Sequence, residues 1–525
     1  MKILDLGASD GYVSRWLLDQ FPTARVDAVE ISEKRAAIAR ERIQGRGAVR
    51  VGMAEDAPDL FEPGTYDAVV AFELIEHVPD VDRLLDACEA MVKPGGRIYL
   101  STPDGTFGPG GNPSHLRVYR LKDLADVLRR RGQIVSIMSG PDKITVAAYT
   151  PGQKGPEVVI HTGGGWARWD PIDVNHKGLG GSETWAVRLA EHLDALGCIV
   201  TVYGECGDGL WGGAIFRHHS RWDPTEPVDV LIASRNPALI DARPRARYRV
   251  LWVHDVDCGD LLTPARADQF DHVVGLSDWH TNHLAGRYPF LGSRLVQSHN
   301  GIEHSLFRPR PWAERAKRVL YTSSPDRGLD VVLELWPRVR EQVPDATLAY
   351  CYPDVYDAVA EQRPEIGAHR DRIRALSAQP GVDRLGSLPQ PTLAAMMCDS
   401  RVWVHPSWCT AHPAPDGGIV EEFPFHETSC IGALEAQAAG CHVVASGWGA
   451  LKQTVRYGHL LDVGNPRDER WRDAFVTSVV EGLTNPDTGM AAEQIAPDMV
   501  ADMGWRSVAE QVLGLTVGAS REQAA

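Results

Sequence analysis

The sequence predicts an α/β protein built from three successive Rossmann-like domains. Short apolar strands alternate with amphipathic helices along most of the chain, a pattern typical of parallel sheets covered by helices. Glycine-rich turns at 7–11 and 180–181 each lead into a helix, as cofactor and phosphate loops do. A proline- and glycine-rich segment at 151–156 separates the first series of strands and helices from the remainder. We therefore expect one domain before this segment and a longer doubly wound region after it.

Composition and charge are those of a folded globular protein. At 525 residues the chain is too long for one ordinary domain. Apolar residues make up 43% and charged residues 24%, which argues against a disordered chain. Lys and Arg number 54 against 70 Asp and Glu, giving a net charge of −16. Because such an acidic chain repels phosphate backbones, we expect no nucleic-acid binding.

Cysteine usage and targeting signals bear on location. The nine cysteines are scattered, which fits a reducing compartment without a disulfide framework. We find no signal peptide, no amphipathic presequence and no apolar run long enough to cross a bilayer. These features predict a cytoplasmic protein without a transmembrane segment, and they leave peripheral contact with a membrane open.

The first domain, residues 1–150, begins with a strand, a tight glycine turn and a helix. The turn holds Gly7 and Gly11, and glycine lets the backbone approach a ligand closely. The second strand ends in Glu30, which is placed to accept hydrogen bonds from ribose hydroxyls. Asp56 follows the third strand, and the fourth runs into the loop 72–77. The pattern predicts a nucleotide-type cofactor site.

This domain resembles class I S-adenosylmethionine-dependent methyltransferases over essentially its whole length, and loop 72–77 resembles that of small-molecule O-methyltransferases. A nicotinamide-dinucleotide domain would need a G-x-G-x-x-G fingerprint, which is absent. Ser9 stands where a middle glycine is more usual. The resemblance implies that S-adenosylmethionine is the cofactor and that its site includes Asp5, Gly7, Gly11, Glu30, Asp56 and Phe72.

Methyl transfer to a hydroxyl needs a base or a metal near the acceptor. His77 and His115 are the catalytic candidates by residue type; for each the alternative is a structural role, which for His77 is to order its loop, as that histidine often does in the resembling families. Relatives usually carry a helix ahead of the first strand, and here nothing precedes Met1. Either the cofactor pocket is more open, another domain covers it, or the domain binds cofactor without efficient catalysis.

The stretch 423–446 contains two glutamates, Glu427 and Glu435, around the start of a predicted helix. We expect Thr428 or Ser429 to cap that helix and an apolar strand to follow it. A helix that begins at the carboxyl edge of a sheet offers free backbone N–H groups to an anion such as a diphosphate. Taken alone, the spacing is also compatible with an ordinary helix carrying two solvated glutamates.

This stretch resembles the signature of retaining GT-B glycosyltransferases of family 4. The resemblance implies two Rossmann-like halves, an acceptor half at 157–310 and a nucleotide-sugar donor half at 312–516 that ends in a crossing helix. It also implies that Glu435 binds the nucleotide ribose, that Glu427 lies near the donor sugar, and that Thr428 and Ser429 help to bind the donor.

Further segments carry the same resemblance in the acceptor half. Gly180 and Gly181 resemble a loop that approaches the donor phosphates from across the cleft. His254 follows a predicted strand and resembles a histidine that contacts the donor sugar; the alternative is a core histidine.

In the donor half, Arg327 stands where relatives carry a lysine that neutralises the leaving diphosphate. A second cation is missing, because Thr322 occupies its position, and Lys452 is a candidate replacement. The nucleotide base is expected near 386–388. A zinc site at His405, Cys409 and His412 is a weak alternative, since no fourth ligand is evident, and we expect no metal.

These features together predict a bifunctional enzyme that transfers a sugar from a nucleotide-sugar donor to a glycan or glycoconjugate and methylates the sugar. Two alternatives remain open. One is a glycosyltransferase whose first domain only binds the methyl donor or serves as a scaffold. The other is a non-catalytic carbohydrate-binding protein on a GT-B frame.

Overall fold

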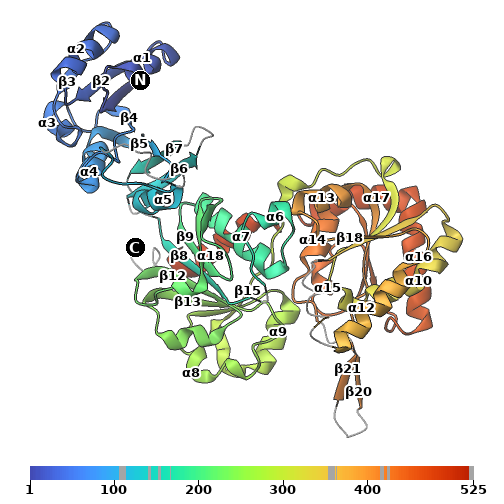
Figure 1. Ribbon diagram of the computed structural model, residues 1–525. Helices are drawn as coiled ribbons and strands as arrows, with labels where there is room; N and C mark the ends of the chain where they lie inside the picture. The colour runs from blue at the N-terminus through green and yellow to red at the C-terminus, as the bar shows by residue number, and fades with distance from the viewer. Residues whose placement is uncertain are drawn as a thin grey trace. The chain divides into compact units, whose positions relative to one another are not determined.

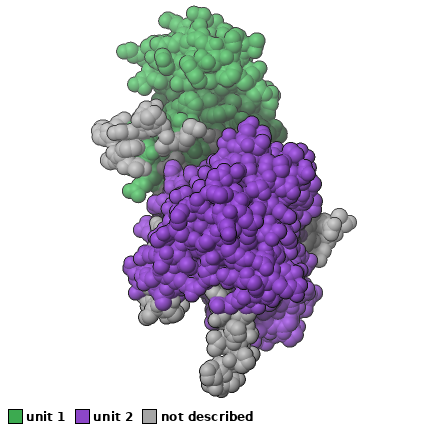
Figure 2. All heavy atoms as spheres, turned by 90° about the vertical axis from the view of Figure 1, so that its right-hand side faces the viewer, with its two compact units in different colours: residues 1–156, 197–199 green, residues 157–196, 200–525 purple. Residues whose placement is uncertain are grey.

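The computed structural model describes residues 1–525 except 106–113, 130, 140–143, 152–154, 166, 353–360, 362–363, 409, 414–418, 423–425 and 519–525. The chain folds into two compact units, coloured separately in Figure 2. Unit 1 comprises residues 1–156 with 197–199, and unit 2 comprises 157–196 with 200–525. Among the described residues, no helix is both long and apolar enough to cross a bilayer.

Unit 1 is a seven-stranded sheet in the order β3-β2-β1-β4-β5-β7-β6. Only β7 runs antiparallel to its neighbours. The parallel strands are rich in Val, Ile and Leu because both faces of the sheet are covered by helices. The strands are β1 (Lys2–Leu6), β2 (Arg25–Glu30), β3 (Val49–Val51), β4 (Tyr66–Phe72), β5 (Val92–Pro103), β6 (Gly132–Ser139) and β7 (Ile144–Pro151).

The helices of unit 1 connect these strands and bury one apolar side each. In α4, Leu84, Leu85 and Cys88 pack into the core at helical spacing. The helices are α1 (Tyr12–Gln20), α2 (Glu33–Arg42), α3 (Ala57–Leu60), α4 (Val81–Met91) and α5 (Leu121–Arg129).

The first half of unit 2, residues 157–310, is an eight-stranded sheet in the order β10-β11-β9-β8-β12-β13-β14-β15. It is parallel apart from β10, which forms a hairpin with β11. Its strands are β8 (Glu157–Gly163), β9 (Ile199–Gly204), β10 (Gly209–Trp211), β11 (Ala214–His218), β12 (Val228–Ser234), β13 (Ala246–Trp252), β14 (His272–Gly275) and β15 (Leu295–Gln297). Its helices are α6 (Asp173–His176), α7 (Gly181–Ala195), α8 (Pro264–Ala267) and α9 (Asp278–Arg287).

The second half of unit 2, from residue 312 onward, is a six-stranded parallel sheet in the order β18-β17-β16-β19-β22-β23. Its strands are β16 (Ala316–Tyr321), β17 (Thr347–Cys351), β18 (Val382–Gly386), β19 (Ser400–His405), β22 (His442–Ser446) and β23 (His459–Leu461), with a separate hairpin of β20 (Thr410–Pro413) and β21 (Ile419–Glu422). Its helices are α10 (Leu329–Gln342), α12 (Pro364–Ser377), α13 (Gln390–Cys398), α14 (Ile431–Ala438), α15 (Leu451–Thr454), α16 (Glu469–Thr484), α17 (Pro486–Met499) and α18 (Trp505–Leu513).

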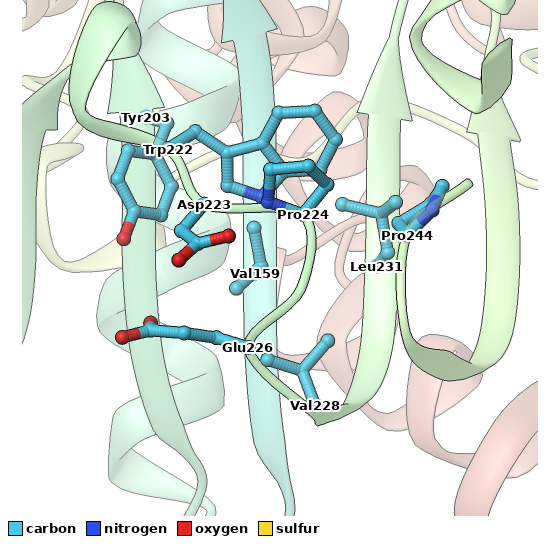
Figure 3. Close-up of a pocket in the computed structure, with 9 residues that line it drawn as sticks. All are labelled: Val159, Tyr203, Trp222, Asp223, Pro224, Glu226, Val228, Leu231 and Pro244. Atoms are coloured by element: carbon cyan, nitrogen blue, oxygen red, sulfur yellow. The ribbon is translucent and has the colours of Figure 1, made fainter. Parts of the chain in front are cut away.

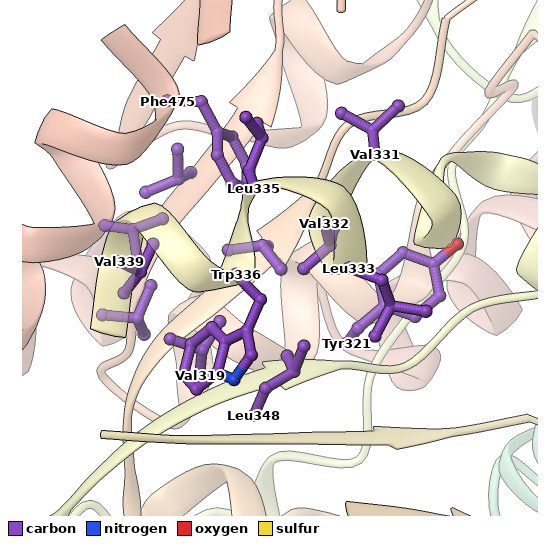
Figure 4. Close-up of a cluster of buried hydrophobic side chains, with 14 of the residues drawn as sticks. Val319, Tyr321, Val331, Val332, Leu333, Leu335, Trp336, Val339, Leu348 and Phe475 are labelled. Carbon is purple, nitrogen blue, oxygen red and sulfur yellow. The ribbon is translucent and has the colours of Figure 1, made fainter. Parts of the chain in front are cut away.

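The core of the second half lies between α10 and the sheet. Figure 4 shows Trp336 of α10 packed beside Val319 and Leu348 of the central strands. Trp336 also donates a hydrogen bond from its indole nitrogen to the Pro380 carbonyl at 3.1 Å, so its one polar atom is satisfied. This packing fixes the strand ends from which the site loops of this half emerge.

The last helix returns to the first half of unit 2. Helix α18 packs against α7 (Figure 1), and Gln511 donates a hydrogen bond to the Gln297 carbonyl at 2.6 Å. A Cβ on Gly301 would lie 2.6 Å from the Trp505 backbone nitrogen, so glycine is needed where the chain passes between the halves. These contacts join the two halves into one unit.

Candidate functional site

The glycine turn after β1 is closed by the carboxylate of Glu30. Gly7, Ser9 and Gly11 all have positive φ, and the turn ends at the start of α1. The Glu30 oxygens accept hydrogen bonds from the backbone amides of Ser9 at 2.8 Å and Ser32 at 3.0 Å. Glu30 is therefore held at the carboxyl ends of β1 and β2, where the sequence predicts the ribose of the cofactor. Ser9 shows why a middle glycine is dispensable, because serine adopts the left-handed conformation here.

The other acids of the predicted cofactor site are already engaged. Asp5 is buried and accepts a hydrogen bond from the Ser14 hydroxyl at 2.5 Å. Burial raises the pKa of Asp5 to about 6, and the hydrogen bond from Ser14 opposes that rise. Asp56 pairs with Arg83 at 2.5 Å and keeps about a third of its side chain exposed. Asp5 thus supports the turn through Ser14, and Asp56 is held by Arg83.

The loop after β4 carries both predicted histidines of unit 1. Phe72 ends β4, and the side chain of Leu74 lies close enough to touch a Cβ placed on Gly7. The His77 and His115 rings meet edge to face with their centroids 4.8 Å apart. His77 Nδ1 lies 3.0 Å from the Ser114 carbonyl, which ties the loop to the segment that carries His115. The structure therefore brings the two histidines together and also gives His77 an ordering role.

A buried glutamate beside these histidines was missed by the sequence analysis. Glu76 is 1% exposed, and both of its carboxylate oxygens lack a hydrogen-bond partner among the described residues. One ligand atom from each of Glu76, His77 and His115 falls within 4.8 Å of the others. The glutamate-histidine pair was visible in the sequence, but burial of the glutamate was not, since alternating charge in a loop usually marks solvent exposure.

Exposed apolar side chains flank the glycine turn. Tyr12, Ile31 and Met53 follow β1, β2 and β3 respectively and are 72%, 69% and 39% exposed. Each follows a parallel strand at the sheet edge that carries the predicted cofactor residues, where an exposed apolar side chain offers a surface to a planar base. In the sequence, the apolar residue directly after Glu30 could have indicated this surface, but it was overlooked.

In unit 2, two helix N-termini face each other across the halves. Gly180 precedes α7 and Cys430 precedes α14. A Cβ on Gly181 would lie 3.7 Å from Cδ1 of Ile431, the first residue of α14. Both helices begin without a side-chain cap, so their free backbone N–H groups converge on the same region. This arrangement concentrates partial positive charge between the two halves.

The predicted cap of α14 is wrong. The helix begins at Ile431, and neither Thr428 nor Ser429 caps it. Thr428 donates from its hydroxyl to the His254 carbonyl at 3.1 Å, and the Ser429 hydroxyl accepts from the Asn300 amide at 3.2 Å. The two side chains instead join the loop before α14 to the first half of unit 2, a tertiary use that local sequence does not reveal.

Glu427 forms the centre of a buried charged cluster. Its Oε1 lies 2.7 Å from Nε2 of His405 and 3.5 Å from a guanidinium nitrogen of Arg327. Burial raises the pKa of Glu427, but the Arg327 charge and the His405 contact outweigh it and hold the pKa below its ordinary value. His405 is fully buried and lies nearly parallel to the Trp403 ring at 5.5 Å. Glu427 is therefore an ionised carboxylate at neutral pH.

Two side chains that the sequence analysis did not identify link Glu435 to the first half of unit 2. Gln390 donates from Nε2 to Oε1 of Glu435 at 3.0 Å. The Gln390 carbonyl oxygen accepts from Arg188 of α7 at 2.6 Å. Burial raises the pKa of Glu435 to about 7, and the Gln390 hydrogen bond and the Arg188 charge oppose that rise. No motif marks Gln390 and Arg188, which are 202 residues apart and meet only in the folded chain.

His254 lies just beyond β13, packed edge to face on Trp185 at 4.6 Å. Burial and the nearby Arg235 charge lower the pKa of His254 well below its ordinary value, so the ring is neutral. Its Nε2 is inaccessible and has no hydrogen-bond partner among the described residues. A buried unpaired ring nitrogen is costly unless a ligand supplies the partner.

The remaining candidates of the second half lie as follows. Lys452 pairs with Asp462 at 3.2 Å and is mostly exposed. Thr322 accepts a hydrogen bond from the Trp403 indole at 2.9 Å. Ser387, in the loop expected to seat the base, donates to the Lys177 carbonyl. Of the weak zinc alternative, Cys409 and the His412 side chain lie outside the described residues, and His405 faces Glu427.

A hollow in the first half of unit 2 is separate from these residues. Figure 3 shows Trp222 covering the strands at Val159 and Leu231, with the carboxylates of Asp223 and Glu226 at one side. It contains none of the predicted site residues, and its apolar lining is part of the packing of the sheet.

The first comparison concerns unit 1. Residues 4–100 match a family model described as a methyltransferase domain. This part of the chain is therefore similar to methyltransferase domains. The ubiquinone biosynthesis O-methyltransferase of Leptothrix cholodnii is 33% identical over 105 residues, covering 19% of this chain and 44% of the relative. That of Xylella fastidiosa is 29% identical over 157 residues, covering 26% of this chain and 63% of the relative. The chain thus spans less than two thirds of either relative.

The second comparison concerns the rest of the chain. A sucrose-phosphate synthase from Thermosynechococcus elongatus superposes with a TM-score of 0.51 at 15% identity, covering 70% of this chain and 100% of that structure. That share exceeds what unit 1 can supply, so the similarity lies in the two sheets of unit 2. The predicted fold class, a Rossmann-like methyltransferase domain followed by a GT-B fold made of two Rossmann-like halves, is confirmed.

Proposed function

We propose that this protein is a bifunctional glycan-modifying enzyme. Unit 2 transfers a sugar from a nucleotide-sugar donor to a glycan or glycoconjugate, with retention at the sugar carbon. Unit 1 methylates the transferred sugar or the glycan that it extends, using S-adenosylmethionine. Fusing the two activities raises the local concentration of one product at the next site. The domain boundaries of the proposal are 1–150, 157–310 and 312–516.

The observation that carries the sugar-transfer half is the convergence of the α7 and α14 N-termini. A diphosphate bound at the N-termini of α7 and α14 would receive backbone N–H groups from both helices. Arg327 stands near this region and offsets the charge that develops on the leaving diphosphate. These groups stabilise a departing diphosphate without a metal ion.

The glutamates take different roles in this proposal. Glu427 is held ionised by Arg327 and His405, so it accepts hydrogen bonds from the donor sugar and favours positive charge developing on the ring. Glu435 accepts hydrogen bonds from the ribose hydroxyls. Nε2 of His254, which is buried without a partner among the described residues in the first half of unit 2, would accept a hydrogen bond from a sugar hydroxyl once donor binding gives access to it. Each role uses an atom that the protein has buried in or beside the interface of the halves.

For unit 1, the residues fit the methyl donor. Glu30 accepts the ribose hydroxyls, Asp56 borders the base, and Ile31 and Met53 pack against the base plane. Bound S-adenosylmethionine supplies an electrophilic methyl group, and His77 or His115 takes the proton of the acceptor hydroxyl as the new bond forms. The 4.8 Å separation of the two rings leaves either histidine able to serve.

The test measures whether the transferred sugar and the methyl group appear in the same product. The purified chain is incubated with a panel of nucleotide sugars, glycan acceptors and methyl-labelled S-adenosylmethionine, and products are analysed by mass spectrometry. We expect a sugar and a labelled methyl in the same glycan. Glu435→Ala should abolish sugar addition while leaving S-adenosylmethionine binding intact, and Glu30→Ala should do the reverse. Sugar transfer without label in any glycan would favour the scaffold alternative.

Absence of transfer or hydrolysis across the donor panel would favour the second alternative, a carbohydrate-binding protein on a GT-B frame. In that case Glu435→Ala would still alter binding of a glycan or nucleotide. A calorimetric titration of the wild type and this variant with the same panel separates the two outcomes.

A further inference from the structure

A second cluster of chemically capable side chains lies in the first half of unit 2. Glu205 directly follows β9, and His218 and His219 stand at the end of β11. The register pairs Gly204 with His218 across these parallel strands, which brings Glu205 beside both histidines. One ligand atom from each of the three residues lies within 4.8 Å of the others. No role in sugar or methyl transfer requires this cluster.

Two of the spacings in this cluster match those between ligand atoms of a metal coordination sphere. Nε2 of His218 lies 3.3 Å from Oε1 of Glu205, and Nε2 of His219 lies 3.2 Å from Oε2. Ligand atoms around a tetrahedral zinc ion with bonds of about 2.0–2.1 Å are separated by roughly 3.3 Å. Two imidazoles and a carboxylate are also a donor set that borderline divalent metals prefer.

The backbone around the cluster is fixed before any ligand arrives. The Trp169 amide donates to the Glu205 carbonyl at 3.0 Å, and the Cys206 thiol donates to the Arg217 carbonyl at 3.3 Å. A Cβ on Gly164 would touch Glu205 and His219 at 3.5 Å, so glycine leaves room on that side. The three side chains are 27–38% exposed, which leaves a path for an ion to enter.

Ser220 provides an outer-sphere partner for His218. Its hydroxyl lies 2.7 Å from Nδ1, the ring nitrogen that does not face Glu205. The Ser220 amide approaches the same nitrogen at 3.3 Å, a contact that suits the metal-free ring with its proton on Nε2. With a metal ion at Nε2 the ring proton would lie on Nδ1, which would then donate a hydrogen bond to the Ser220 hydroxyl oxygen in place of accepting one from the Ser220 amide. Such partners orient ligating histidines and increase their basicity.

We propose that Glu205, His218 and His219 form a binding site for a divalent transition metal ion, with zinc as the preferred ion. Three protein ligands leave one position of a four-coordinate ion for water or an incoming oxygen ligand. The site lies at the same edge of the sheet as His254, but β9 and β13 are separated by β8 and β12. At about 4.8 Å per strand, the two are roughly 14 Å apart, so this site is separate from the donor-binding residues.

The test measures zinc bound to the full chain. The protein is stripped with a chelator, dialysed against zinc at defined free concentration, and analysed by elemental mass spectrometry. We expect the wild type to retain one ion more per chain than Glu205→Ala or the double variant His218→Ala/His219→Ala. Ser220→Ala should weaken zinc binding about 10–100-fold while keeping the stoichiometry. Circular dichroism checks that each variant is folded.

His77→Ala is the matched control, because it removes a histidine from a different three-residue group of possible ligands and leaves this one intact. It should retain the ion at Glu205. Equal stoichiometry and affinity in the wild type and Glu205→Ala would overturn the proposal, as would an ion that disappears only in His77→Ala. Since neither transfer reaction enters the readout, the result is independent of the proposed function.

Discussion

Gln390 donates a hydrogen bond to Glu435 at 3.0 Å. This hydrogen bond connects the glutamate that is predicted to bind ribose with the first half of unit 2. The other end of the Gln390 amide accepts from Arg188 of α7. Arg188 is 8% exposed and also pairs with Glu191 at 2.9 Å. The carboxylate that would hold the nucleotide is therefore oriented by side chains from both halves.

The first prediction concerns the pH dependence of stability. Because burial raises the pKa of Glu435 to about 7, the folded protein binds a proton there that the unfolded chain releases near its ordinary pKa of 4.5. The stabilisation is therefore full below pH 4.5 and is lost as the pH rises toward 7, by an amount on the order of 3 kcal/mol. The Glu435→Gln variant has no carboxyl group to ionise at this position, so it should not show this loss of stability.

The measurement is urea unfolding of the wild type and Glu435→Gln between pH 5 and pH 8, with the difference between them as the readout. We expect Glu435→Gln to gain relative stability as the pH rises. Glu481→Gln, which changes an exposed glutamate of α16, is the control and should track the wild type. A wild-type to Glu435→Gln difference that stays constant with pH would contradict the raised pKa.

The second prediction concerns Gln390 itself. Gln390→Ala removes the donor to Glu435 and leaves the buried Arg188 guanidinium without one acceptor, at a cost of about 1–3 kcal/mol. Because the Gln390 hydrogen bond no longer offsets the effect of burial, the pKa of Glu435 rises further. We expect nucleotide binding to weaken about tenfold at pH 7, and the pH at which binding reaches half its maximum to move upward.

Calorimetric titration with nucleotide diphosphates across pH 6 to 9 measures both effects. Gln342→Ala removes an exposed glutamine at the end of α10 and serves as the control. A loss of affinity that is the same at every pH would mean that Gln390 acts on the nucleotide directly and does not tune Glu435.

The third prediction separates two cations. Arg327 lies 3.5 Å from Glu427 beside the converging helix ends, whereas Lys452 pairs with Asp462 on the surface. If Arg327 offsets charge on the leaving diphosphate, Arg327→Ala should lower kcat by about 10²–10³-fold with a smaller change in KM. Lys452→Ala should change either constant less than about twofold.

Arg327→Lys is the informative intermediate, because it keeps the charge and loses the bidentate geometry. We expect partial recovery of kcat relative to Arg327→Ala. Should Lys452→Ala lower kcat as much as Arg327→Ala, the missing cation of this site would be Lys452 after all.

The sequence predicted the layout of this protein better than its contacts. Strand–helix alternation and the glycine turns at Gly7 and Gly181 are local signals, so fold class and sheet edges followed from them. Contacts between distant segments have no such signal. Thr428 and Ser429 had the residue types of helix caps, but their hydroxyls form hydrogen bonds with His254 and Asn300 instead.

The same limit explains the missed residues. Gln390 and Glu76 are ordinary polar residues in the sequence, and only burial beside other titratable groups makes them notable. The KPGG segment at 93–96 has residue types that are typical of a turn. The structure places it inside the long strand β5, where the register with β4 shifts between Tyr66 and Ala68. The irregularity in the register accommodates the extra residues of β5, with Gly95 at positive φ, and residue types alone do not distinguish it from a turn ahead of the strand.

The fourth prediction concerns the cofactor turn of unit 1. Glu30 accepts hydrogen bonds from the amides of Ser9 and Ser32, so it closes the turn, and in our proposal its carboxylate also binds the cofactor ribose. Glu30→Ala leaves two amides without their acceptor and removes the ribose contact. We expect the affinity for S-adenosylmethionine to fall by at least about tenfold, since hydrogen bonds to a charged acceptor contribute about 1.5–3 kcal/mol.

Glu33→Ala is the matched control for this variant. Glu33 lies three residues further on, is exposed, and pairs with Arg40 at 2.9 Å on the surface of α2. Because such a pair contributes little, calorimetry should give wild-type affinity for S-adenosylmethionine. Glu30→Gln keeps the shape and one acceptor oxygen, so its affinity should fall between those of the wild type and Glu30→Ala. Equal affinities for Glu30→Ala and Glu33→Ala would place the cofactor ribose away from the end of β2.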